Sequence, residues 1–379
     1  MNKHSVFKKT IWVLNLLLLV LASPVASQEK APVSSFRPAL PDYEYQFPRD
    51  FFSHDDFRIE WWYYTGHLED DTGRPFGYQL TFFRVALDEK DKVDNASQWK
   101  IGHIYFAHMT LSDIATGKFY FFERINRAGL GQAGAESDQL KVWNENWSLT
   151  QNGKAHHLRA QEGEVTFDLK LIPSKPLVIH GKDGVSQKGE TSGNASHYFT
   201  FTRMRTEGQV NLKGKNYKLK GLSWMDHEFS SNQLDEEQIG WDWFSVQLNN
   251  DTELMIYQIR RKNGAIETNS SGTWVDADGR GTHLTLSEYS IQPKGQWVSK
   301  QSGTTYPAEW ILEVPKQGIH LKVTPEMADQ ELHNLRSIST SYWEGSVKVS
   351  GTVKGKPVEG KGYVELVGYT QPLKQDLPE

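Results

Sequence analysis

The chain has 379 residues, a formal net charge of −5 at pH 7 and no cysteine. The lack of cysteine excludes disulfide bonds, thiolate zinc sites, a cysteine nucleophile and lipid attachment through an N-terminal cysteine. The lysines and arginines are scattered and form no basic block, so nucleic acid is not an expected partner. Aromatic residues make up 12% of the chain, and they either fill barrel cores or line apolar pockets.

The first 27 residues have the pattern of a signal peptide. Three lysines precede an apolar run at residues 11–21, which is too short to span a bilayer. Small residues follow at Val25-Ala26-Ser27, as expected before a cleavage site. We therefore expect a secreted or periplasmic protein cleaved near Ser27. The remaining 352 residues (379 − 27) are enough for two domains.

Short strands are predicted along most of the mature chain. Residues 28–47 hold three prolines and no periodicity, and we expect an extended lead-in. The aromatic run at 60–68 predicts a strand, followed by a turn at 69–75 and a returning strand at 76–85. Further strands are predicted at 101–111, 118–123, 147–150, 165–172, 197–205 and 210–219. The best helical apolar period is at 326–335. Regular short strands separated by turn residues indicate an all-β sandwich or barrel.

The chain also repeats itself. Residues 241–248 match 61–68 at an offset of 180, and Tyr257 matches Tyr78 after a one-residue slip. A Gly-Lys hairpin closes each unit at an offset of 141, which pairs Gly221 with Gly362. We therefore predict two related all-β domains, at 48–230 and 231–372, with a tail at 373–379. Superposition should place Tyr78 on Tyr257 and Gly221 on Gly362.

Two acids and an imidazole stand together at Asp226-His227-Glu228, between apolar residues. Such neighbours desolvate charges and shift pKa values, which favours a reaction centre. On a regular strand His227 faces away from the two acids, so the three meet only if the strand ends or bulges. The alternative is a solvated strand end. At the same offset the second unit has Val367-Gly368-Tyr369, which indicates chemistry added to the first unit only.

The aromatic hairpins supply candidate ligand-binding residues. Their aromatic side chains face both ways, which fits either core packing or a wall for a hydrophobic ligand. The polar members are either satisfied inward groups or groups that orient a ligand. Because a short link joins the units, we expect the tryptophans and Tyr257 to share one cleft with the acids at the junction. The candidates are Trp61, His67, Gln79, Trp224, Trp241, Asp242 and Trp243.

No metal or cofactor is expected. His103 and His108 are five residues apart and face opposite ways on a strand, which rejects shared ligation.

These motifs together resemble a known family. At residues 60–68, 76–84, 105–108, 221–229, 240–243, 342–345 and 362–369 the sequence resembles the carotenoid hydratase (hydroxyneurosporene synthase)-like family of secreted lipocalin-like proteins. The resemblance covers nearly all of the mature chain and implies two tandem lipocalin-like β-barrels. The hydratases are similar in carrying Asp-His-x-Trp and, a strand later, Tyr-x-Asp, whose Asp donates a proton. Here Phe229 replaces the Trp, and Ile259 follows Tyr257 where the proton donor would be.

Hydration of an isolated double bond needs a neutral acid that protonates carbon, followed by water. Burial keeps a carboxylic acid neutral, and aromatic faces stabilise the cation. The catalytic candidates are Asp226, His227, Glu228 and Tyr257; in a hydrolase, a carboxylate or His227 would activate water. We expect a protein that acts on a hydrophobic or isoprenoid-type small molecule as a hydratase or hydrolase. The alternatives are a lipid or apolar-ligand binding protein without chemistry and a periplasmic accessory protein of a membrane complex.

The signal-peptide pattern makes a direct prediction. Mass spectrometry of protein taken from the cell envelope should find an N-terminus at or near Gln28, because signal peptidase cuts after small residues. A full-length chain in the cytoplasm would rule secretion out.

Overall fold

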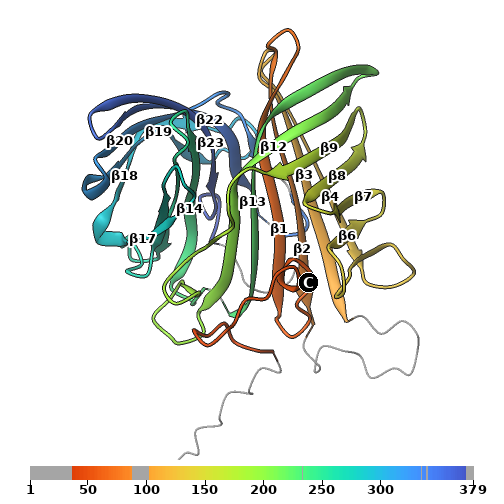
Figure 1. The fold of residues 1–379 in the computed structure, drawn as a ribbon, viewed down its shortest axis with the longest axis horizontal. Helices are drawn as coiled ribbons and strands as arrows, with labels where there is room; N and C mark the ends of the chain where they lie inside the picture. The colour runs from red at the N-terminus through yellow and green to blue at the C-terminus, as the bar shows by residue number, and fades with distance from the viewer. Residues whose placement is uncertain (1–35, 88–101, 233, 334, 339, 373–379) are drawn as a thin grey trace, which may run out of the picture. The chain divides into compact units, whose positions relative to one another are not determined.

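A computed structural model describes residues 36–87, 102–232, 234–333, 335–338 and 340–372 (Figure 1). The expected signal peptide and the tail at 373–379 lie outside the described residues. The regular elements of the described residues are β-strands and three short 3-10 helices. Among the described residues, no helix has the length and apolar character needed to cross a membrane.

The strands form two sheets that follow each other along the chain. The first holds β1 (Ile59–Asp70), β2 (Pro75–Ala86), β3 (His103–Asp113), β4 (Lys118–Arg127), β5 (Ala133–Ala135), β6 (Lys141–Asn144), β7 (Trp147–Asn152), β8 (Ala155–Glu162), β9 (Val165–Pro173), β10 (Val178–Ile179), β11 (Ser186–Gln187), β12 (Ala195–Leu212) and β13 (Lys215–Asn232). The second holds β14 (Gln238–Leu248), β15 (Glu253–Arg261), β16 (Ser271–Val275), β17 (Gly281–Thr285), β18 (Ser290–Val298), β19 (Thr305–Val314), β20 (Ile319–Pro325), β21 (Glu331–Leu332), β22 (Tyr342–Val353) and β23 (Lys356–Leu366). The 3-10 helices are η1 (Arg49–Phe51), η3 (Leu286–Glu288) and η4 (Pro315–Gln317).

The two sheets have the same strand order. The first runs β4-β3-β2-β1-β13-β12-β9-β8-β7-β6-β5, and the second runs β17-β16-β15-β14-β23-β22-β20-β19-β18. In each, the last strand returns to pair antiparallel with the first, β13 with β1 and β23 with β14. Strand order and pairing confirm the prediction of an all-β protein with two lipocalin-like barrels.

One local prediction was wrong, and the best of the weak helical patterns formed no helix. Residues 210–219 are not one strand but the hairpin between β12 and β13, because Lys213 and Gly214 both have positive φ and turn the chain. Residues 326–335 form no helix in their described part. They contain only the short strand β21, which pairs with β22. Pairing with a neighbouring strand outweighed the weak helical period there.

The register of the closing strands also differs from the prediction. Gly66 of β1 lies opposite Ser223, and its equivalent at offset 180, Val246 of β14, lies opposite Gly362. The offset of the closing strands is therefore 139 (362 − 223), and Gly221 does not correspond to Gly362. The arms of the β12–β13 hairpin are two residues longer than those of β22–β23, so matching the Gly-Lys turns misplaces the strands by two residues.

The returning strands show the same kind of shift. Tyr63 lies opposite Thr81, and its equivalent Trp243 lies opposite Tyr257. Tyr257 therefore corresponds to Thr81, whereas the prediction paired it with Tyr78.

A pair of kinked glycines supports the corrected register. Gly208 and Gly351 have φ of 156° and 159°, and an added Cβ at either would lie 2.1 Å from a carbonyl oxygen of the next strand. They lie opposite Leu219 and Val358, which are again 139 residues apart. Each half thus needs a glycine at the same place in its penultimate strand.

The outer faces of the two sheets are joined by reciprocal hydrogen bonds. His67 Nε2 donates to the Gly362 carbonyl at 2.9 Å, and Gln247 Nε2 donates to the Ser223 carbonyl at 3.1 Å. Gln247 is the equivalent of His67, and Ser223 is the equivalent of Gly362. The same contact is made twice in opposite directions, as in a two-fold related pair of subunits.

Strand alternation divides the aromatic residues of the hairpins between the cores of the two sheets and a junction cluster. On β1, Trp62 and Tyr64 point into the core of the first sheet, whereas Tyr63 and the partly buried Trp61 belong to a junction cluster with Trp243. The second sheet has its own core. Core packing therefore holds for one face of the aromatic hairpin, and the other face packs in the junction cluster.

The reciprocal hydrogen bonds predict a stability effect. Gln247→Leu should lower the free energy of unfolding by about 2 kcal/mol, because it leaves the buried carbonyls of Ser223 and Thr202 without their donor. The control is Gln292→Leu on the exposed face of β18, which should change it by less than about 0.5 kcal/mol. Urea denaturation measures both, and equal midpoints for the two variants would contradict the assignment.

Candidate functional site

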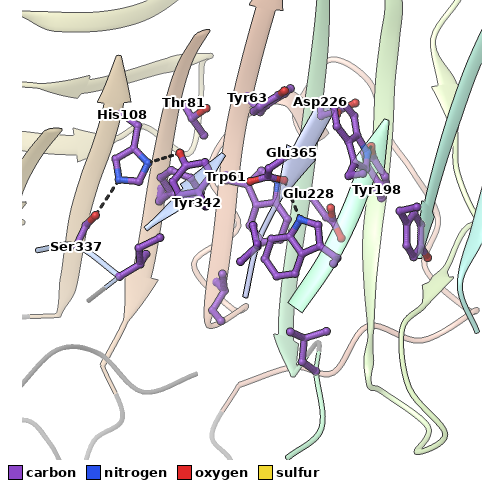
Figure 2. A pocket seen from close by; sticks show the side chains of 18 of the residues that line it. Trp61, Tyr63, Thr81, His108, Tyr198, Asp226, Glu228, Ser337, Tyr342 and Glu365 are labelled. Carbon is purple, nitrogen blue, oxygen red and sulfur yellow. Dashed lines mark hydrogen bonds between the residues drawn. The ribbon is translucent and has the colours of Figure 1, made fainter. Parts of the chain in front are cut away.

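A cavity of about 240 Å³ lies between the outer faces of the two sheets (Figure 2). Both sheets supply its walls, and most of the wall is aromatic or aliphatic. The first sheet and its loops contribute Trp61, Tyr63, Gln79, Thr81, Phe83, His108, Lys188, Tyr198, Asp226 and Glu228. The second contributes Trp241, Trp243, Tyr257, Ile259, Ser337, Tyr342 and Glu365.

The β-sheet register explains how these residues meet. Asp226 and Glu228 are two residues apart on β13, so both face the cavity. Tyr63 lies directly opposite Asp226, and Trp61 lies opposite Glu228. The strand therefore neither ends nor bulges at the acids.

The second sheet supplies an acid at the matching position. Trp243, the equivalent of Tyr63, lies opposite Glu365, which makes Glu365 the equivalent of Asp226. The expectation that the second unit lacks an acid was wrong, because the offset of 141 pointed two residues too far along β23. Val367 corresponds to Glu228. Each half thus places a carboxyl group at this equivalent position of the cavity wall, as Figure 2 shows for Asp226 and Glu365.

Asp226 holds its proton to a much higher pH than an ordinary aspartic acid. Only 4% of the residue is exposed, and burial raises the pKa of its carboxyl group to about 7, with a smaller rise from the charge of Glu228. Its Oδ1 accepts hydrogen bonds from Thr200 Oγ1 and from Trp224 Nε1, the latter at 2.8 Å. At neutral pH the Asp226 carboxyl is therefore protonated in a substantial fraction of molecules.

Glu228 is instead paired with a cation. Lys188 Nζ lies 3.1 Å from Glu228 Oε1 and 4.3 Å from the centre of the Tyr257 ring. Burial lowers the pKa of Lys188, but the combined effect of Glu228 and Tyr257 outweighs burial and the net shift is upward. The Tyr257 hydroxyl accepts a hydrogen bond from Ser271 at 2.9 Å. Lys188 and Glu228 thus form one polar corner of the cavity.

Glu365 and its neighbours form the other polar region. Trp241 Nε1 donates to Glu365 Oε2 at 2.8 Å, and burial raises the pKa of Glu365 to about 7. Glu344 lies directly opposite Glu365 on β22. Burial and the charge of Glu365 hold the pKa of Glu344 well above its usual range.

His108 joins this region through neutral hydrogen bonds. Its ring nitrogens lie 2.8 Å from the Tyr342 hydroxyl and 2.8 Å from Ser337 Oγ, as Figure 2 shows. Burial lowers the pKa of His108 to about 4, so the imidazole is neutral at pH 7.

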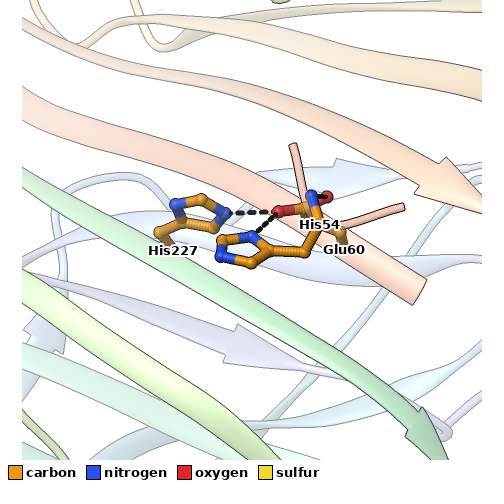
Figure 3. A group of neighbouring side chains, drawn as sticks. All are labelled: His54, Glu60 and His227. Carbon is orange, nitrogen blue, oxygen red and sulfur yellow. Dashed lines mark hydrogen bonds and ion pairs between the residues drawn. The ribbon is translucent and has the colours of Figure 1, made fainter. Parts of the chain in front are cut away.

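His227 does not join the acids, contrary to the expectation that the three converge. It faces the core of the first sheet, where its ring lies 4.9 Å from those of Trp62 and Phe199. Its Nε2 lies 2.8 Å from Glu60 Oε1, and His54 Nδ1 lies 2.7 Å from the same oxygen (Figure 3). The regular strand alternation that pairs the two acids sends His227 to the other face.

His54, Glu60 and His227 are a group that could hold a metal ion, with ligand atoms within 4.8 Å of one another. Arg84 Nε, however, donates to the other oxygen of Glu60 at 3.0 Å. Burial opposes charge on His54, but Glu60 and Asp50 outweigh it and raise the His54 pKa. These positive charges already neutralise the buried carboxylates, so the charge balance favours this hydrogen-bonded network over a divalent ion.

Three other candidates also lie outside the cavity wall. His67 ties the two sheets together, as described above, and Ser346 and Glu326 lie beside its other nitrogen. Asp242 faces away from the cavity and pairs with Arg260 at 3.1 Å. Trp224 packs in the junction cluster and contributes through its hydrogen bond to Asp226. The candidates that do line the cavity are Trp61, Gln79, Trp241, Trp243, Asp226, Glu228 and Tyr257.

The sequence interpretation missed several polar residues of the wall, among them Lys188, His108, Tyr342 and Glu365. Lys188 lies in a loop beside β11, and nothing in its local sequence marks it. His108 was considered only as half of a metal pair. Tyr342 and Glu365 lie in motifs used for the family resemblance, and an alignment by strand register would have shown that Glu365 is the counterpart of Asp226.

Comparison with known proteins finds several relatives. A family model described as AttH-like matches residues 38–369. A solved structure from Nitrosomonas europaea, assigned as AttH, is 34% identical and covers 88% of this chain and 100% of that one, with a TM-score of 0.80.

Kievitone hydratases are also similar. The enzyme of Fusarium solani subsp. phaseoli is 25% identical over 213 residues, or 55% of this chain, and the match spans 58% of that enzyme's length. The crystal structure of kievitone hydratase from Nectria haematococca shares the fold, with a TM-score of 0.67 and 18% identity over 90% of this chain and 99% of that chain.

The position of His227 predicts a structural role. His227→Ala should lower the free energy of unfolding by about 2–4 kcal/mol, because it opens a cavity in the core and removes a partner of Glu60. Binding of the apolar dye anilinonaphthalene sulfonate to the junction cavity should stay within about twofold. The control is His320→Ala, whose side chain is 58% exposed. Lost dye binding with unchanged stability would instead support a role for His227 in the site.

Proposed function

Because the chain belongs to the AttH-like family, we propose that it is a hydratase-like enzyme that adds water across a carbon–carbon double bond of an apolar small molecule. The similarity to kievitone hydratase supports the reaction class. The observation that carries the proposal is Asp226, a buried carboxylic acid with a pKa of about 7 in a cavity walled by aromatic rings. The proposal includes secretion, so the enzyme encounters its substrate outside the cytoplasm.

The geometry suits protonation of carbon. A neutral Asp226 donates its proton to one carbon of the double bond, which leaves a cation on the other. Rings on both walls, including Trp61, Tyr63 and Trp243, face the cavity, and each aromatic face stabilises a desolvated cation by up to about 2 kcal/mol. Water then adds to the cation. Glu228 is less suited to donate the proton, because its charge is paired with Lys188.

A binding protein without chemistry is the second candidate. Ile259 lines the cavity, and the resemblance to carotenoid hydratases puts their proton donor at this position. A cavity of this kind still holds an apolar molecule when its acids take no part in a reaction. A hydrolase is less favoured, because His227 lies outside the cavity, although Glu228 and Glu365 remain as carboxylates that would activate water.

The acid proposal predicts the behaviour of Asp226→Asn. Wild-type protein incubated with kievitone or a set of apolar alkenes should produce an adduct one water heavier, as detected by mass spectrometry. Asp226→Asn should slow this at least about 100-fold, since it removes the proton donor, while dye binding stays within twofold. The wild-type rate should fall as pH rises above about 7, because Asp226 then loses its proton.

A matched control separates chemistry from folding. Asp242→Asn removes a buried acid on the other face of β14 and should lower stability but keep turnover. An Asp226→Asn variant with wild-type turnover would contradict the assignment. Dye binding without turnover of any alkene by the wild type would favour the binding protein.

A further inference from the structure

Gln79 presents an unused acceptor to the cavity. The residue is 1% exposed on β2 and lines the wall. Its Nε2 donates to Thr81 Oγ1 at 2.9 Å, but its side-chain oxygen has no hydrogen-bond partner within the described part of the chain. Buried acceptors are nearly always satisfied by protein or water, so this oxygen is open to a donor from water or from a ligand in the cavity.

Glu365 presents a second acceptor from the opposite sheet. Trp241 occupies its Oε2, which leaves Oε1 for another donor. Neither Glu365 nor Glu344 forms an ion pair with Lys, Arg or His among the described residues. Glu344 is buried and Glu365 is half-buried. Two acids directly opposite each other on paired strands repel, so at neutral pH the pair retains a proton, held chiefly by Glu344. Glu365 is therefore the member that can carry charge and accept a proton.

The fold itself does not require this pair. In the first half, Thr200 lies opposite Asp226, at the place that Glu344 holds opposite Glu365. A hydroxyl group therefore satisfies the same position in the same strand arrangement. The second half has instead placed a buried acid there, at the cost of desolvating two carboxyl groups.

We propose that Glu365 of the second sheet and the side-chain oxygen of Gln79 of the first sheet form a subsite for a hydroxyl group in the cavity, in which Glu365 takes the proton that water loses as it adds to the substrate. The binding part needs only the cavity, whereas the proton transfer rests on the proposed function. Tyr342 lines the same cavity, and its hydroxyl interacts with Gln79 and with Glu344, which lies opposite Glu365. The ligand class is an apolar molecule with a hydroxyl group at this end.

The proton transfers balance. The O–H bond of Asp226 breaks as a C–H bond forms on the substrate. The water oxygen forms the C–O bond, and one water O–H bond breaks as its proton passes to the Glu365 carboxylate. Asp226 ends ionised and Glu365 ends protonated, so one proton must return from the second acid to the first, directly or through solvent, before the next turnover.

Binding tests the subsite without a known substrate. Titration of wild-type protein with naphthol and naphthalene, followed by tryptophan fluorescence, should show naphthol binding about tenfold tighter. In Glu365→Gln and in Gln79→Leu the ratio should fall to about two or less, with naphthalene affinity within twofold of wild type. Glu359→Gln, exposed on the same strand β23, is the control and should keep the wild-type ratio.

Two results would overturn the subsite. They are equal affinities for naphthol and naphthalene in the wild type, and an unchanged ratio in both variants. Because Gln79 is buried, its variant is interpreted only if its melting temperature stays close to wild type; Glu365→Gln, which keeps the side-chain shape, gives the independent reading.

Turnover tests the proton transfer. With an alkene that the wild type hydrates, Glu365→Gln should lower kcat at least 100-fold and remove the fall in rate below about pH 7, where Glu365 becomes protonated. Wild-type kcat in Glu365→Gln would overturn its role as base. If the wild type hydrates no alkene, both the proposed function and the proton transfer are wrong. The ratio of the affinities for naphthol and naphthalene still tests the binding subsite independently.

Discussion

Contact between the outer faces of β1 and β13 and those of β14 and β23 is the constraint on which the site depends. A lipocalin-like sheet usually leaves its outer face to solvent or covers it with other elements. Here each half covers the other, and His67 and Gln247 fix the two sheets by the same hydrogen bond made in both directions. The cavity and its acids exist only because these two faces are buried together.

Burial explains why the carboxyl groups behave differently from one another. Glu60 and Glu228 lie as deep as Asp226, but each has a cation beside it. Asp226 and Glu365 have aromatic rings and hydroxyl or indole donors instead, so burial raises the pKa of both to about 7. Charge pairing thus separates acids that hold the structure from acids that can exchange protons near neutral pH.

Sequence reasoning found the architecture and half of the site. The strand-like alternation along the aromatic hairpins predicted the strands, and the sequence repeat at offset 180 predicted two related units. The same period already separated His227 from Asp226 and Glu228, and the expected convergence was wrong because it required a bulge that the strand does not have. Lys188 could not be found, since a loop residue carries no periodicity to place it. Glu365 was missed because a turn motif was used to align the strands of the two halves. A hairpin arm can be two residues longer in one half without changing which side chains face the core, so the alignment was off by two residues.

The two halves differ in the polar residues that they place at the two ends of the cavity. Asp226 and Glu365 are equivalents, and a perfectly symmetric cavity would accept a molecule in either of two directions. Glu228, however, corresponds to Val367, and only the Glu228 side carries the ammonium group of Lys188 between two tyrosine rings. Glu344 likewise replaces the threonine found opposite Asp226. One end of the cavity is therefore an ion pair and the other a pair of acids sharing a proton. In the proposed function, this asymmetry sets which acid meets which end of a bound molecule and gives different roles to two carboxyl groups at equivalent positions of the fold.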